Sequence, residues 1–183
     1  MTDIWVIRHG EAVPTSEQHR DPDLTALGRE QAALVPGKLL TSLPSNVTLL
    51  SSPLARAQQT AEPLAKALSA SVNVVPAFRE IPVPVSITER DRWLKAYFSQ
   101  RWAEQPEVLW QWRHALIDAM ANVTGPTVIF SHFLVINTLI GHIRGIEETV
   151  SVMPANTSIN HFRRVDGRLQ IVSVGEQLET RIN

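Results

Sequence analysis

The chain has 183 residues and contains no cysteine. This absence excludes disulfide bonds, thiolate metal sites and every mechanism with a cysteine nucleophile, including that of the cysteine phosphatases. The chain also lacks any apolar run approaching the roughly 20 residues that a membrane-spanning helix requires. The apolar run after residue 3 is only four residues long, too short for the core of a signal peptide. We therefore expect a cytoplasmic protein that does not bind a membrane.

An excess of charge of one sign is absent as well. The formal net charge is −1, so no broad basic surface is available for nucleic acid, and we expect no nucleic-acid partner. The P-loop, dinucleotide-binding, zinc-protease and serine-hydrolase motifs are also missing. The hydrophobic content of 44% and the length are sufficient for one well-buried core. We expect a single domain over residues 1–183.

The first apolar segment ends in residues that can carry chemistry. Residues 4–7 read as a buried strand, and Arg8, His9 and Gly10 follow directly. In open α/β sheets, ligands bind beyond the carboxyl ends of the strands, so Arg8 and His9 are expected at the rim of a pocket, with Gly10 allowing the backbone to approach a ligand. An imidazole beside a fixed cation can attack phosphorus, although a tripeptide alone can also arise by chance.

A second arginine, Arg56, is expected near the N-terminus of a helix, where a positive charge is unfavourable unless an anion is bound. Residues 47–51 predict a strand, and Ser52 and Pro53 predict the N-cap and the first residue of a following helix. Arg56 then lies in the opening turns of that helix, although the helix dipole favours anions there. A bound anion would neutralise both charges, so the sequence indicates an anion-binding site at Arg56.

The remaining segments predict alternating helices and strands. Thr25 caps a helix from Ala26, and Pro36-Gly37 predicts a kink or a break in it. Further helices are expected over 88–103, over 106–123, and from 135 to either Gly141 or Gly145. Strands are expected over 72–75 and 127–131, with a C-terminal hairpin over 159–165 and 168–174. Four tryptophans lie in the two central helices, and we interpret them as helix packing rather than as an aromatic lid over a substrate.

Three motifs occur in an order and spacing that resemble the histidine phosphatase superfamily, which has the phosphoglycerate mutase-like fold. They are RHG after the first strand, LTALGREQA at 24–32 and SSPLARAQQTA at 51–61. The resemblance implies an α/β fold, a three-layer αβα sandwich with a mostly parallel central sheet. The predicted C-terminal hairpin would form an antiparallel edge of that sheet.

The resemblance also implies residue roles. The histidine that matches His9 is transiently phosphorylated in this family, and the arginines that match Arg8 and Arg56 clamp the phosphoryl group. His132, which follows the strand over 127–131, matches the histidine that completes the phosphate pocket. Glu80 matches the proton donor to the leaving group. These matches imply a phosphomonoester hydrolase with a phosphohistidine intermediate that works without a metal or another cofactor.

The chain departs from the family pattern at two places. Pro82–Val85 stand where Gly-x-Trp-Glu-Gly usually follows the residue that matches Glu80, and Phe133 and Leu134 stand where two glycines are usual. The bulky pair predicts a narrower pocket. Asn156 resembles the family's Asn-x-Ser segment, where it supports the pocket histidine or only forms a turn.

Three functions remain compatible with these residues. The first is a phosphatase that acts on a small-molecule phosphomonoester or a phosphoprotein. The second is a phosphoglycerate-type mutase, which returns the phosphoryl group to another hydroxyl; the short chain and the missing segment after Glu80 argue against it. The third is a catalytically weak module that binds phosphorylated ligands, against which the complete set Arg8, His9, Arg56 and His132 argues.

Overall fold

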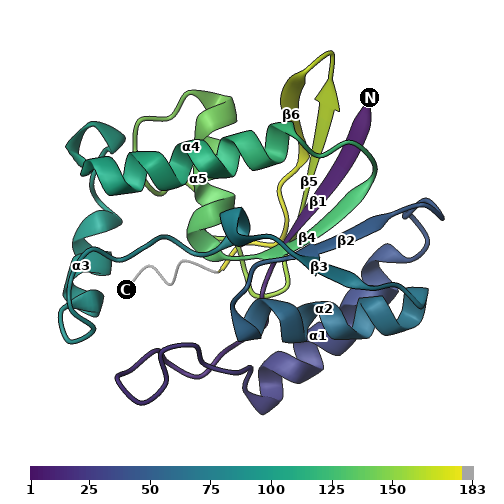
Figure 1. Cartoon of the computed structure of the whole chain (residues 1–183), viewed down its shortest axis with the longest axis horizontal. Helices are drawn as coiled ribbons and strands as arrows, with labels where there is room; N and C mark the ends of the chain where they lie inside the picture. Colours follow the sequence, from purple (N-terminus) through teal and green to yellow (C-terminus); the bar gives the residue numbers. More distant parts are fainter. Residues whose placement is uncertain (179–183) are drawn as a thin grey trace.

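A six-stranded sheet forms the centre of the molecule in the computed structural model, which describes residues 1–178 (Figure 1). In spatial order the strands are β3 (Val72–Val74), β2 (Thr48–Ser51), β4 (Thr127–Ser131), β1 (Thr2–Arg8), β5 (Ile159–Val165) and β6 (Arg168–Ser173). The first four strands in this order are parallel, whereas β5 is antiparallel to β1 and β6 to β5. The mostly parallel sheet with an antiparallel edge hairpin is therefore confirmed.

Helices cover both faces of the sheet (Figure 1). Helices α1 (Ala26–Leu39) and α2 (Ala55–Leu68) lie on one side, and α4 (Glu107–Ala121) and α5 (Phe133–Arg144) lie on the other. Successive side chains of β1 alternate between two apolar cores: Ile4 and Val6 join the cluster beneath α4 and α5, while Trp5 and Ile7 join the cluster beneath α1 and α2. The three-layer αβα sandwich is confirmed.

The register of β1 and β4 brings two histidines together. Arg8 lies opposite Ser131 in the parallel pair, and the next residue on each strand is a histidine, His9 and His132. The backbone N–H of His9 donates to the carbonyl of Ser131 at 2.9 Å. Both histidines therefore leave the sheet at the carboxyl ends of adjacent strands, where open α/β sheets bind ligands.

Helix α1 continues through Pro36, so a break at that residue does not occur. Val35 and Leu39, on either side of the proline, are 0% and 2% exposed. The backbone N–H of Leu40 still donates to the carbonyl of Pro36 at 2.9 Å. Burying each of these large side chains contributes about 1.5–3 kcal/mol, enough to offset the roughly 3 kcal/mol that an internal proline costs.

Helix α2 begins later than the sequence predicts. Its first residue is Ala55 and its N-cap position is Leu54, so the prediction of Ser52 as N-cap and Pro53 as first helical residue is wrong. The Ser52 hydroxyl instead accepts the backbone N–H of Leu54 at 3.2 Å, within the turn before the helix. Arg56 is the second residue of α2 and lies in its opening turn, as predicted.

The predicted helix over 88–103 is shorter than expected. Helix α3 spans Arg90–Tyr97. Beyond it the backbone N–H of Trp102 donates to the carbonyl of Glu147, and a short 3₁₀ helix follows over Trp102–Glu104. Long-range backbone pairing therefore replaces the last turns of this helix. A second 3₁₀ helix, Pro76–Phe78, leads from β3 toward Glu80.

The last two predicted elements agree closely with the structure. Helix α5 begins at Phe133, directly after His132, and ends at Arg144; Gly145, with a φ of 67°, is its left-handed C-cap. The C-terminal hairpin turns at Asp166 and Gly167, which have φ values of 50° and 78°. Two successive positive φ values are typical of the tight hairpin turn predicted from this pair.

Candidate active site

Five predicted site residues meet at the carboxyl ends of β1 and β4. The rings of His9 and His132 have centroids 5.2 Å apart and are inclined by 61°. Arg56, from the first turn of α2, donates from Nε to Nε2 of His9 at 3.1 Å. Arg8 and Glu80 line the same cavity as His9 and Arg56. Residues separated by more than 120 positions are thus placed around one small volume.

The hydrogen bonds of His9 define its protonated nitrogen. Nδ1 lies 2.6 Å from the carbonyl oxygen of Gly10. A carbonyl oxygen only accepts, so Nδ1 carries the proton and donates. Nε2 accepts from Arg56 and therefore holds the free electron pair. The ring is fixed in the tautomer that presents Nε2 as a nucleophile.

Both imidazoles are neutral at physiological pH. Burial, together with the positive charges of Arg56 and Arg8, lowers the pKa of His9 to about 3, and the hydrogen bond to Gly10 opposes this shift. Burial also holds the pKa of His132 well below its usual range, and the nearby His9 and Arg56 act in the same direction. Neutral rings keep their lone pairs available, which a nucleophile requires.

The two arginines are held by the protein and remain charged. Arg8 donates from Nη1 to the carbonyl of Pro154 at 2.7 Å, and its guanidinium carbon lies 5.2 Å from the ring centre of Phe133. Within residues 1–178 its buried Nε has no hydrogen-bond partner. Arg56 is 8% exposed, and one of its Nη atoms lies 3.8 Å from the Asp21 carboxylate. The pocket therefore has two oriented cations, and Nε of Arg8 is available to donate to a ligand.

Glu80 is placed where it can be a proton donor. Its two carboxyl oxygens accept the backbone N–H groups of Ile81 at 3.1 Å and Leu134 at 3.4 Å. Burial raises the pKa of the Glu80 carboxyl, while Arg56, these two backbone groups and Arg8 oppose the rise. The net upward direction favours a protonated acid at higher pH than for an exposed glutamate.

His132 is fully buried. Its exposed fraction is 0%, and its Nε2 lies 2.7 Å from the Ser52 hydroxyl oxygen. In the described part of the chain, Nδ1 of His132 has no hydrogen-bond partner. An unpartnered buried polar group costs about 1–3 kcal/mol, so this nitrogen would gain by meeting a ligand atom.

Gly10 and Asn156 support the backbone around His9. Asn156 donates from Nδ2 to the carbonyl of His9 at 3.0 Å, so it contacts the first histidine rather than His132. A Cβ on Gly10 would lie 2.5 Å from the carbonyl oxygen of Gly28 in α1. Gly10 is therefore required by the close approach of a helix, whereas the sequence suggested the approach of a ligand.

The cavity is much larger than one phosphate. It has a volume of about 1220 Å³, and its walls include α3, Phe133 and the segment after Glu80. No tryptophan lines it, which agrees with the interpretation of the tryptophans as packing; Trp102 is 3% exposed and belongs to an apolar cluster with Tyr97 and Leu109. Phe133 narrows one side, where its ring stacks on Phe98 at 5.4 Å.

Sequence reasoning missed several residues of the site. The sequence predicts only a helix cap at Ser52. It identifies Thr60, whose hydroxyl accepts the backbone N–H of Gly10 at 3.0 Å, only as part of a motif. Arg79 and Arg90 also line the cavity. The motif that contains Ser52 and Thr60 was a usable signal for those two. Nothing in the sequence places Arg90, because its position depends on where α3 packs.

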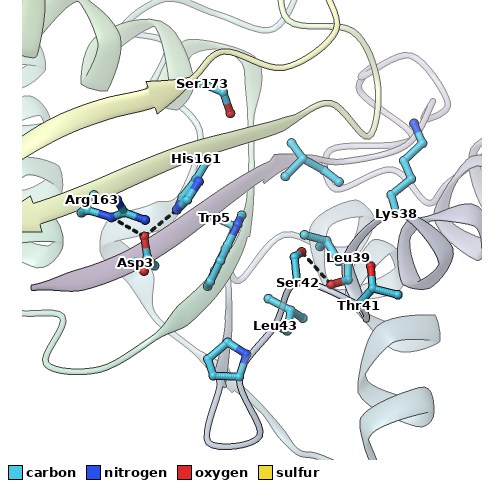
Figure 2. Close-up of a pocket in the computed structure, with 12 residues that line it drawn as sticks. Asp3, Trp5, Lys38, Leu39, Thr41, Ser42, Leu43, His161, Arg163 and Ser173 are labelled. Atoms are coloured by element: carbon cyan, nitrogen blue, oxygen red, sulfur yellow. Dashed lines mark hydrogen bonds and ion pairs between the residues drawn. The ribbon is translucent and has the colours of Figure 1, made fainter.

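A second hollow, of about 660 Å³, lies on the sheet face beside α1 (Figure 2). Its charges are already paired: Asp3 accepts from both His161 and Arg163 at 2.7 Å, and Lys38 pairs with Glu176 at 3.2 Å. Trp5 stacks on His161 with ring centroids 4.9 Å apart. These contacts account for the hollow as a structural feature of the sheet.

Two further features bear on function. No group of three or more histidine, aspartate or glutamate side chains within residues 1–178 is arranged to hold a metal ion. No helix among these residues is long and apolar enough to cross a membrane.

The chain matches the model of the histidine phosphatase superfamily (branch 1) over residues 4–177. It therefore belongs to this superfamily, which confirms the resemblance found in the motifs around His9 and Arg56. No curated protein matches the chain by sequence.

Solved structures share the fold at low sequence identity. Phosphoserine phosphatase from Entamoeba histolytica, in complex with 3-phosphoglyceric acid, is 21% identical with a TM-score of 0.73, and the match covers 97% of this chain and 98% of that one. Mycobacterial glucosyl-3-phosphoglycerate phosphatase, in complex with VO₃, is 20% identical with a TM-score of 0.72, covering 97% and 100% of the two chains.

Proposed function

We propose that the protein is a phosphatase that hydrolyses phosphomonoesters through a phosphohistidine on His9. The observation that carries the proposal is the environment of this residue: a neutral ring with its proton on Nδ1, held by Gly10, and its lone pair on Nε2 next to the guanidinium of Arg56. A nucleophile and an oriented cation at this spacing suit attack on phosphorus. Membership of the histidine phosphatase superfamily supports the same reaction.

In the first step, Nε2 of His9 attacks phosphorus in line with the ester bond. The new P–N bond forms as the P–O bond to the leaving group breaks, and Glu80 transfers its proton to the departing oxygen. Arg8 and Arg56 bind the equatorial phosphoryl oxygens, whose negative charge a guanidinium matches well. The raised pKa of Glu80, caused mainly by burial, keeps this proton available.

In the second step, water attacks the phosphorus of phosphohistidine. The ionised Glu80 accepts a proton from the water, the P–N bond breaks, and His9 recovers its lone pair. Inorganic phosphate is released and Glu80 is protonated again, so the enzyme returns to its starting state. Two displacements replace one difficult reaction.

In this proposal His132, like Arg8 and Arg56, donates a hydrogen bond to the phosphoryl group. The Ser52 hydroxyl has one proton, and donation to Nε2 of His132 gives that proton an acceptor at 2.7 Å. The neutral ring then carries its own proton on Nδ1, the nitrogen that has no other partner within residues 1–178. A phosphoryl oxygen would satisfy it. Ser52 thereby selects the tautomer in which His132 is a donor.

The phosphoryl charge is met by protein groups, so we propose that no metal ion is needed. Each oriented charge-stabilising group is expected to matter by about 10²–10³ in rate. The substrates that fit this scheme are small phosphomonoesters, since the fold is shared with phosphatases named for phosphoserine and glucosyl-3-phosphoglycerate. A phosphorylated side chain of a protein presents the same terminal group and is a second substrate class of the same reaction.

The test is a panel of phosphomonoesters assayed with and without a chelator. We expect hydrolysis by the wild-type protein in both conditions, with acid-labile, alkali-stable phosphate on the protein after rapid quenching. The His9→Ala variant should lose at least about 10⁴-fold in turnover together with the labile phosphate. His142→Ala is the control, because His142 is exposed at the far end of α5. Activity that survives His9→Ala would exclude the mechanism.

A further inference from the structure

The cavity is lined by further arginines beyond the two beside His9. Arg79, immediately before Glu80, and Arg90, in the first turn of α3, line the same cavity as Arg8 and Arg56. The charges of Arg90 and Arg79 lower the pKa of Arg56, after the larger effects of burial, Glu80 and Asp21. Both outer arginines therefore lie within electrostatic reach of the phosphoryl site without belonging to it.

The outer arginines are poorly neutralised by the protein. Within residues 1–178, Arg79 forms no ion pair. The partner of Arg90 is Asp91 at 3.3 Å, whose side chain is 94% exposed. Such an exposed pair contributes at most about 1 kcal/mol. The guanidinium side chain of Arg90 is itself only 26% exposed, so a long cation is held at the cavity wall with little compensation.

Apolar side chains lie beside this pair of cations. Leu94 and Phe98 follow Arg90 at intervals of four residues, so all three lie along one side of α3 and its C-cap, and all three line the cavity. Phe98 stacks on Phe133 at 5.4 Å. The outer half of the cavity therefore offers an apolar surface for a carbon skeleton and two cations for a second charged group.

We propose that Arg79 and Arg90 form a second anion subsite, so that the preferred substrates are phosphomonoesters that carry another anionic group, a carboxylate or a second phosphate. The inference rests on the proposed phosphatase function and deepens it. Guanidinium groups bind both oxyanions by paired N–H donors. The reacting phosphoryl group occupies the inner site at His9, and the second anion lies toward α3.

The experiment compares three aryl esters that share one leaving group skeleton: phenyl phosphate, carboxyphenyl phosphate and phenylene bisphosphate. We expect the wild-type protein to show higher kcat/KM for one or both charged esters. Which of these two is preferred distinguishes a carboxylate from a phosphate as the second anion. Arg90→Gln and Arg79→Gln should lower kcat/KM for the preferred charged ester about tenfold or more, mainly through KM, as removal of a charged hydrogen bond does. They should change the value for phenyl phosphate less than about threefold.

Arg92→Gln is the matched control. Arg92 is on the same helix and the substitution removes the same charge, but its side chain is 85% exposed and does not line the cavity. This substitution should leave kcat/KM for all three esters unchanged. As a second measurement, calorimetric titration of the esters into His9→Ala protein should show the same preference for the charged ester, and Arg90→Gln in that background should abolish it.

Two results would overturn the subsite. In one, the wild-type protein hydrolyses charged and uncharged esters equally well. In the other, Arg90→Gln and Arg79→Gln lower kcat/KM for phenyl phosphate as much as for the charged esters. These arginines would then act on the reacting phosphoryl group and not on a second anion. Absence of hydrolysis and of phosphoenzyme with every ester is a different outcome, because it would contradict the phosphatase function itself.

Discussion

The proposed chemistry depends on which nitrogen of His9 carries a proton. Gly10 accepts from Nδ1, which leaves Nε2 unprotonated beside Arg56. With the proton on the other nitrogen, the ring would present a donor to phosphorus and could not attack. A single backbone carbonyl therefore decides whether this residue is a nucleophile.

Glu80 gives a testable pH dependence. Burial raises the pKa of its carboxyl, and the first step uses the protonated form, so kcat/KM should fall as pH rises through a pKa above the ordinary value of about 4.3. In Glu80→Gln this alkaline limb should disappear, and kcat/KM for an alkyl phosphate should fall about 10²–10⁴-fold. Pre-steady-state and steady-state kinetics across pH measure both effects.

The same variant should behave differently with 4-nitrophenyl phosphate, whose leaving group needs no proton. Its first step should be nearly unimpaired in Glu80→Gln, and phosphoenzyme should accumulate because the base for the second step is missing. Glu62→Gln, an exposed carboxylate on α2, is the control. An unchanged alkaline limb in Glu80→Gln would assign it to another group.

For individual residues, the sequence indicates which side chains lie near one another better than it indicates their hydrogen-bond partners. Arg8, His9 and His132 were expected together because each follows a buried strand, and strand ends share one edge of a sheet. The side chain of Asn156, predicted to support the pocket histidine or to form a turn, donates to the backbone of His9. The interaction between Ser52 and His132 joins residues 80 positions apart. Such a side-chain contact depends on loop conformations that no local pattern encodes.

Among the elements, α1 contributes no side chain to the phosphoryl site but fixes the loop that follows His9. Gly28 packs against the loop that follows His9: a Cβ on Gly28 would collide with the backbone carbonyl of Glu11, and one on Gly10 would lie 2.5 Å from the carbonyl of Gly28. Thr25, the cap of this helix, also donates to the Glu11 carboxylate at 2.7 Å. The start of α1 and the loop that follows His9 form one tightly packed unit.

Two alanine substitutions in α1 should therefore have opposite effects. Gly28→Ala should destabilise the protein by about 1–3 kcal/mol, because overpacking forces backbone shifts, and it should lower kcat by displacing the loop. Gly37→Ala, in the same helix with nothing within 4 Å of the added Cβ, should stabilise by about 0.5–1 kcal/mol. Urea unfolding and steady-state kinetics measure both. Equal behaviour of the two variants would contradict the packing argument.

Tertiary contacts determine the lengths of two helices that local sequence patterns predict incorrectly. Apolar burial on both sides of Pro36 keeps α1 continuous, although the residue itself disfavours a helix interior. In the predicted helix over 88–103, pairing of Trp102 with Glu147 ends the helical stretch early. The hairpin turn at Asp166-Gly167 was predictable because its backbone angles favour these two residue types.

For the whole molecule, the buried histidines make stability depend on pH. The pKa of His9 falls to about 3 on folding and that of His132 falls in the same direction, both mainly by burial. Below about pH 6.5 the unfolded chain therefore binds protons that the folded protein excludes, so stability is lost as pH falls. The slope approaches about 1.4 kcal/mol per pH unit for each histidine.

Denaturant unfolding between pH 7 and pH 5 measures this slope. His9→Asn and His132→Asn should each reduce it, whatever their effect on absolute stability, and the double variant should reduce it further. A slope that is the same in the wild-type protein and the double variant would show that other groups cause the acid sensitivity.

The overall architecture followed from the sequence because motif order and strand pattern agreed on one fold. The family match over residues 4–177 and the order of the six strands confirm that level of description. The shape of the outer cavity did not follow, since Arg90, Leu94 and Phe98 reach it only through the packing of α3. The residues that depart from the family pattern, among them Pro82, Val83, Val85 and Phe133, line this cavity as well.

The pairing of Arg8 with Ser131 across β1 and β4 has a consequence for how such a protein can diversify. Because backbone hydrogen bonds keep neighbouring strands about 4.8 Å apart, the separation of the two imidazoles is inherited from the sheet and is insensitive to surrounding side chains. Residues 82–98, which follow Glu80, can therefore be exchanged to suit another ester while the proposed phosphoryl site keeps its dimensions. A one-residue insertion before the histidine in either strand would instead turn that histidine to the opposite face of the sheet.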